Sequence, residues 1–175
     1  MKTKKEVRFF SIFAYEKEQE YLRRQHKAGW KFVKVTGLGM YHFEECAAED
    51  VIYQLDYNQE ASANKEEYQK MFADCGWEYL QDYMGYSYFR KAAALMDGEE
   101  EIFSDDSSRL AMMERIIKGR MLPMLVIFFA CLIPQFFNHL NGGRYFTAGL
   151  LGATLLLYVC VFAYCAIVYY KKIRK

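Results

Sequence analysis

The chain has 175 residues, of which 53% are hydrophobic, and its formal net charge is +1. All 22 acidic residues lie between Glu6 and Glu114, whereas the long apolar runs follow Met121. This distribution excludes a wholly soluble globule, a disordered chain and a whole-chain nucleic-acid binder, and it predicts a small soluble domain followed by a membrane anchor.

Residues 1–95 contain two similar segments. Ala28-Gly29-Trp30 is echoed by Cys75-Gly76-Trp77, and Tyr21 corresponds to Tyr68 at the same offset. Each Gly-Trp pair follows a predicted helix, because glycine is typical of helix C-termini, and precedes a strand that turns at glycine into an aromatic strand. A further strand precedes each helix, so the pattern predicts two tandem strand-helix-strand-strand (βαββ) units. The predicted strands are Glu6–Phe13, Lys31–Thr36, Gly39–Phe43, Asp50–Tyr57, Glu78–Tyr83 and Gly85–Phe89.

These elements predict an α+β domain in which an antiparallel sheet has two helices on one face. The residues Tyr68, Met71, Phe72 and Cys75 have the spacing of one apolar helix face, so Cys75 is expected to be buried. The repeat further predicts that both tryptophans occupy equivalent buried positions, each packed against its own helix.

The order of elements resembles the tandem strand-helix-strand-strand modules of the GyrI-like ligand-binding superfamily. Six short segments of the chain resemble sequences of the bacterial family known as domain of unknown function 2812. That family commonly adds two membrane spans and has no assigned catalytic residues, so the resemblance implies no chemistry. The segments that carry it are Tyr15–Leu22, Ala28–Phe32, Tyr53–Tyr57, Glu67–Tyr79, Tyr88–Lys91 and Glu101–Asp105.

The rest of the chain is predicted to form a linker and three helices. Residues 96–104 form an acidic linker, and residues 105–120 form a juxtamembrane helix with Leu110, Met113 and Ile117 on one stripe. Two uncharged stretches of transmembrane length follow, at 121–140 and 146–170. They are separated by a turn at 141–145 and followed by a basic tail at 171–175.

Basic residues predict the orientation of this hairpin. Arg115, Lys118 and Arg120 precede the first span and four basic residues follow the second, whereas the turn contains only Arg144. Because basic flanks are retained inside, both termini are expected to be cytosolic, with the protein in the plasma membrane and the turn outside. The N-terminus has no apolar core typical of a secretion signal.

Small residues in the second span occur four apart, as Ala148 with Gly152 and Gly149 with Ala153. This spacing predicts close packing of the two spans, with homodimerisation as the alternative. Pro134 lies inside the first span and is expected to kink it.

We find no motif for catalysis, phosphate binding or metal ligation, so the chain is interpreted as a non-enzyme without a cofactor, metal or direct nucleic-acid partner. A pair of Cys75 with His26 or His42 would be a nucleophile only if Cys75 were accessible.

The aromatic content of the N-terminal part is the remaining functional clue. Strand aromatics either fill the core or line a cavity for a flat or amphiphilic small molecule. We therefore predict a membrane-anchored sensory or regulatory module that binds a ligand or protein partner. The alternative is a non-enzymatic adaptor or accessory subunit that recruits a transcriptional regulator or transporter to the membrane. The candidate ligand-lining residues are Tyr41, Phe43, Tyr53, Tyr57, Tyr86 and Tyr88.

Overall fold

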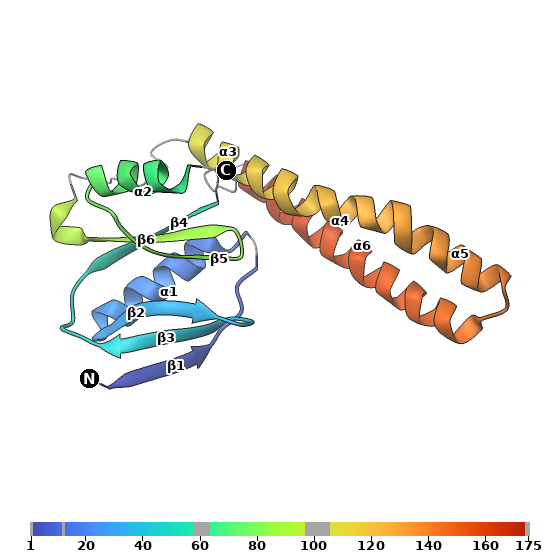
Figure 1. Ribbon diagram of the computed structural model, residues 1–175, viewed down its shortest axis with the longest axis horizontal. Helices are drawn as coiled ribbons and strands as arrows, with labels where there is room; N and C mark the ends of the chain where they lie inside the picture. Colours follow the sequence, from blue (N-terminus) through green and yellow to red (C-terminus); the bar gives the residue numbers. More distant parts are fainter. Residues whose placement is uncertain (1, 12, 58–63, 97–105, 174–175) are drawn as a thin grey trace. The chain divides into compact units, whose positions relative to one another are not determined.

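The computed structural model describes residues 2–11, 13–57, 64–96 and 106–173 (Figure 1). The chain divides into two compact units, Met1–Arg115 and Ile116–Lys175. We call the first the N-terminal domain and the second the helical hairpin. The division falls within a helix that the sequence assigned to the juxtamembrane region.

Within these described ranges, six strands form two separate antiparallel sheets. The first contains β1 (Thr3–Val7), β2 (Trp30–Thr36) and β3 (Met40–Glu45) in the order β1-β3-β2. The second contains β4 (Val51–Tyr57), β5 (Glu78–Tyr83) and β6 (Tyr86–Ala92) in the order β4-β6-β5. The α+β class and the strand-helix-strand-strand order are confirmed, and each half of the domain forms its own sheet.

The first two helices of the N-terminal domain lie in different layers rather than on one face. Helix α1 (Tyr15–Lys27) contacts β4 and β2 and lies between the sheets, whereas α2 (Lys65–Asp74) contacts β5 on the far side of the second sheet (Figure 1). The physical reason is the burial of both faces of β4, in which Gln54 and Asp56 are buried as well as Tyr53 and Leu55. A sheet with two buried faces requires a cover on each side.

Side chains from β5 connect the two sheets. The amide of Gln81 accepts a hydrogen bond from the Val35 backbone N–H at 3.2 Å. The Tyr83 hydroxyl accepts from the Gly39 N–H at 3.0 Å and donates to the Gly37 carbonyl at 2.8 Å. Among the described residues, the boundary between the sheets is therefore bridged by side chains rather than by a backbone ladder.

Strand β1 ends at Val7 instead of continuing to Phe13. Its pairing with β3 begins at Thr3 and ends where Val7 meets Met40, the first residue of β3. Beyond this point the chain leaves the sheet, and Phe13 becomes buried. The Phe10 ring lies 5.7 Å from that of Tyr21. Phe10 and Phe13, which suggested a longer strand, therefore belong to a connecting segment that packs against the domain, whereas Phe9 in the same segment is exposed.

The two halves share matching hydrogen bonds as well as the same element order. Tyr21 of α1 donates to Glu6 of β1 at 2.7 Å, and Tyr68 of α2 donates to Asp56 of β4 at 2.7 Å. Glu6 and Asp56 hold corresponding places in the two sheets, because each lies opposite a residue of the last strand, Tyr41 and Ser87 respectively.

The expected equivalence of the tryptophans is wrong for Trp30. Trp77 is buried against Phe72 and Phe89, whereas Trp30 is only half-buried. At the offset that relates the tryptophans, Phe72 corresponds to Gln25, which is polar. Gln25 accepts a hydrogen bond from Lys4 at 2.7 Å, and the Lys4 ammonium lies 4.9 Å from the centre of the Trp30 ring. The Lys4 ammonium, which is also paired with Glu6 at 2.9 Å, thus takes the place of the aromatic ring that covers Trp77.

A continuous helix leads from the N-terminal domain into the hairpin. It begins with α3 (Asp106–Ile116) and continues through a π-helical turn (Ile117–Met121), α4 (Leu122–Ile127), a second π-helical turn (Phe128–Leu132) and α5 (Ile133–Asn141). Pro134 follows the second π-helical turn at the start of α5. A π-turn relieves the missing hydrogen-bond donor of a proline within a long helix.

The last helix, α6 (Tyr145–Ile173), packs against α5. Ala148 is buried, and a side chain at Gly152 would meet the ring of Phe136 at 3.2 Å. A Cβ added at Gly149 would meet no atom within 4 Å. The row formed by Gly149 and Ala153 therefore does not face α5. Two helical stretches, Ala111–Asn141 and Tyr145–Lys171, are long and apolar enough to cross a membrane, which indicates association with a lipid bilayer.

Candidate functional site

Helix α1 carries polar groups into an aromatic interior. Its buried residues recur at intervals of three and four, so they form a broad face between the two sheets. Most of this face is apolar, but it includes a carboxylate and an imidazole. The buried residues of α1 are Tyr15, Glu18, Tyr21, Leu22 and His26.

Glu18 links α1 to both sheets. Its Oε1 accepts a hydrogen bond from the Tyr41 hydroxyl of β3 at 2.5 Å and another from the Tyr88 hydroxyl of β6 at 2.5 Å. Only 7% of Glu18 is exposed. Because a buried carboxylate without partners is strongly unfavourable, the two hydroxyls make this arrangement possible.

Burial governs the proton affinities of this cluster. It raises the pKa of Glu18 above the ordinary value of 4.5, while the hydrogen bonds from Tyr41 and Tyr88 act in the opposite direction. Burial, reinforced by the charge of Glu18, also raises the pKa of both tyrosines. Both hydroxyls therefore stay protonated and act as donors, so the cluster can exchange one proton, at Glu18.

A second buried pair joins the same helix to β4. The Nδ1 of His26 lies 2.7 Å from the Tyr53 hydroxyl, which also accepts a weaker hydrogen bond from the Phe32 N–H at 3.4 Å. Burial and the charge of Arg90 lower the pKa of His26, so the imidazole is neutral near pH 7. This pair therefore contributes hydrogen bonding rather than charge.

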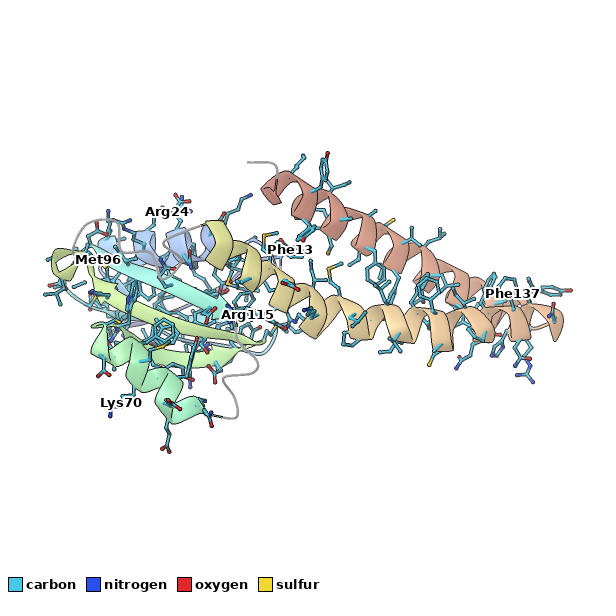
Figure 2. All side chains as sticks on the ribbon, turned by 90° about the horizontal axis from the view of Figure 1, so that it is seen from above. Phe13, Arg24, Lys70, Met96, Arg115 and Phe137 are labelled. Atoms are coloured by element: carbon cyan, nitrogen blue, oxygen red, sulfur yellow. The ribbon has the colours of Figure 1, made fainter. Side chains whose placement is uncertain are left out.

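A third cluster connects β4 to the helix that leads into the hairpin. Asp56 is buried, and it accepts a hydrogen bond from the Tyr68 hydroxyl at 2.7 Å. Arg115 belongs to α3 (Figure 2). Its Nη2 lies 3.4 Å from the other carboxylate oxygen of Asp56. Burial raises the pKa of Asp56, while Tyr68 and Arg115 lower it. Met112 and Met113 of α3 are also buried.

All six candidate ligand-lining side chains are buried. They come from β3, β4 and β6. Their rings contact aromatic neighbours: Tyr57 lies 5.1 Å from Tyr86, Tyr41 lies 6.5 Å from Phe43, and Tyr88 stacks on Phe32 at 5.6 Å. The structure thus brings together the residues that the sequence singled out, while their role in binding a ligand stays a prediction.

Sequence reasoning missed the buried charges. Glu18 has a recognisable signal, because it lies three residues after Tyr15 and four before Leu22, in the middle of an apolar stripe. Asp56 has no comparable signal, because its burial depends on Tyr68 of α2, which is distant from it in the sequence. The expectation for Cys75 is wrong: it is the C-terminal cap of α2 and is exposed. Within the described part of the chain, no three His, Cys, Asp or Glu side chains are placed to hold a metal ion.

No curated protein and no solved structure matches the chain. A family model described as "Protein of unknown function (DUF2812)" matches residues 14–128, which include α1, both sheets apart from β1, and the helix that enters the hairpin. Because this match covers well over half of the 175 residues, the chain belongs to the DUF2812 family.

Proposed function

We propose that the protein is a membrane-anchored regulatory module whose N-terminal domain binds a ligand or protein partner and relays that state to the first membrane span. The observation that carries this proposal is the contact of Arg115 with buried Asp56. Arg115 belongs to a helix that continues without interruption into α4. A change in β4 would therefore alter the free energy of the entering helix, and the coupling must act in both directions.

This coupling gives a direct prediction. Replacing Asp56 with asparagine removes the charge that holds Arg115, so the amides of Ala111–Ile116 should exchange hydrogen faster, on the order of tenfold for a loss of about 1.4 kcal/mol. The measurement is hydrogen exchange by mass spectrometry on the full chain in nanodiscs. Asp82→Asn is the matched control, because Asp82 pairs with Lys65 at the surface at 2.7 Å. Unchanged exchange in Asp56→Asn would contradict the relay.

Binding itself is tested by capturing the full chain from native membranes and identifying associated proteins and small molecules by mass spectrometry. The captured species should change exchange in Ala111–Ile116 of the original chain but not of Asp56→Asn. A species that binds without altering this segment would contradict the regulatory proposal.

A second candidate function is an adaptor that recruits a transcriptional regulator or transporter. It is favoured by the aromatic interior, in which the ring of Phe32 contacts the rings of Tyr53 and Tyr88. A filled interior places recognition on the surface. Capture of a protein alone, with no effect on α3, would support the adaptor.

The proposal places the protein in the plasma membrane with both termini in the cytosol. Three basic residues precede the first span and four follow the second, against Arg144 in the turn. After replacement of the native cysteines, Gly142→Cys should react with a membrane-impermeant thiol reagent in intact cells. Ser107→Cys and Lys175→Cys should react only after the membrane is opened. Labelling of Lys175→Cys in intact cells would exclude a hairpin with both ends inside.

We also infer that the domain consists of two copies of one βαββ unit. The support is the shared element order, the shared sheet order and the corresponding Tyr21–Glu6 and Tyr68–Asp56 hydrogen bonds.

A further inference from the structure

The first sheet exposes large apolar side chains around the turn between β2 and β3. Val7 and Met40 are cross-strand partners. Their exposed neighbours Phe9 and Leu38 lie in the segment after β1 and in the turn itself. These four residues form what we call the hairpin patch, and their exposed fractions are 57% for Val7, 77% for Phe9, 76% for Leu38 and 40% for Met40.

The hairpin patch is held in place by hydrogen bonds. Tyr83 of β5 bonds both Gly37 and Gly39, and the Arg8 N–H donates to the Gly39 carbonyl at 2.9 Å. The two segments approach so closely that a Cβ at Gly39, where φ is +87°, would lie 2.2 Å from the Arg8 carbonyl oxygen. Exposure of Leu38 and Phe9 is therefore a property of an ordered turn.

Basic side chains adjoin the patch on the same face of the sheet. Lys5 of β1 lies opposite His42 of β3, and His42 lies opposite Lys34 of β2. The three side chains therefore form one row across the sheet. Within the described residues, neither Lys5 nor Lys34 forms an ion pair. Arg8, by contrast, lies 3.6 Å from Glu6 and is already paired. This row is cationic although residues 1–120 carry more acidic than basic residues.

We infer that the hairpin patch and the Lys5–His42–Lys34 row form a docking surface for an anionic lipid bilayer. Exposed aromatic and aliphatic side chains beside lysines are the combination that enters a headgroup region while attracting acidic lipids. The chain supplies the bilayer itself, because α3 runs into a helix apolar enough to span it. Such tethering gives a weak surface contact a high effective concentration.

The test uses the full chain in nanodiscs of phosphatidylcholine alone or with about one-third phosphatidylglycerol. After the native cysteines are replaced, Leu38→Cys is labelled with an environment-sensitive dye. The dye should shift to the blue and lose emission to lipid-attached quenchers in the acidic nanodiscs. Raising the salt from 0.1 M to 1 M shortens the screening length from about 10 Å to about 3 Å and should reverse much of this loss.

Two variants complete the experiment. A label at Met71→Cys on α2, where Met71 is 55% exposed, should show neither shift nor quenching. Lys5→Glu with Lys34→Glu should abolish quenching at Leu38→Cys, and unchanged limited proteolysis would show that the domain is still folded. The proposal is overturned if Leu38 and Met71 labels are quenched alike, or if the Leu38 label responds to added membrane proteins but not to acidic lipid.

Discussion

Replacing Trp77 with alanine is expected to destabilise the N-terminal domain by about 3–5 kcal/mol, which is a large share of the stability of a small domain. The indole is buried against Phe72 and Phe89, whose rings stack with centroids 4.1 Å apart. Its removal leaves a void between α2 and the second sheet that the remaining rings cannot fill without moving.

Trp30→Ala is the matched control, because Trp30 is half-buried and is covered by Lys4. Its loss should be clearly smaller. Urea-dependent proteolysis of the full chain in nanodiscs measures both variants through the fraction of intact N-terminal domain. Equal losses of stability in the two variants would contradict the prediction that Trp77 contributes more to folding than Trp30.

Changes at Glu18 should produce the second large effect. In Glu18→Ala the hydroxyls of Tyr41 and Tyr88 lose their acceptor, which costs about 1–3 kcal/mol for each buried donor, in addition to the cavity left by the side chain. Glu18→Gln retains an acceptor oxygen and the volume, so it should be much less destabilised. The same proteolysis assay compares the two variants.

The pH dependence of the stability gap between the original chain and Glu18→Gln identifies the buried acid. Because burial raises the pKa of Glu18 in the folded state, the folded protein binds its proton more tightly than the unfolded chain does. The stabilisation that protonated Glu18 gives the folded state is fully present below the pKa of the unfolded chain, near 4.5. It is lost as the pH rises through the pKa of the folded state. The original chain should therefore lose stability relative to Glu18→Gln over that interval, by up to about 1.4 kcal/mol per pH unit. A gap that grows in favour of the original chain with rising pH would contradict the assignment.

Local patterns in the sequence predicted the elements of this fold well. The glycines before both tryptophans mark the ends of α1 and α2, and the strand predicted at Asp50–Tyr57 is observed as β4 from Val51 to Tyr57. Both apolar helices were also found by composition alone, because a bilayer span requires an uninterrupted run that few soluble helices contain.

The layers were harder to predict because they depend on contacts between distant residues. Periodicity shows that α1 has an apolar face, but not that this face meets β4 of the other half. Alternation likewise divides β4 into two faces, but it does not show that α2 covers Asp56 or that Tyr68 supplies its hydrogen bond. The candidate site was therefore found through its tyrosines, while the acids that organise it were not.

The position of α1 between the sheets has a consequence for how the chain is made. Tyr88, which donates to Glu18, lies 70 residues later in the sequence. At a synthesis rate of about 5–20 residues per second, roughly 4–14 s separate the two residues on the ribosome. During this interval the first half is an incomplete nascent segment whose helix still lacks its partners on β4 and β6. A chaperone bound to α1 would act in this window, before the apolar helices of the hairpin are synthesised and commit the chain to a membrane.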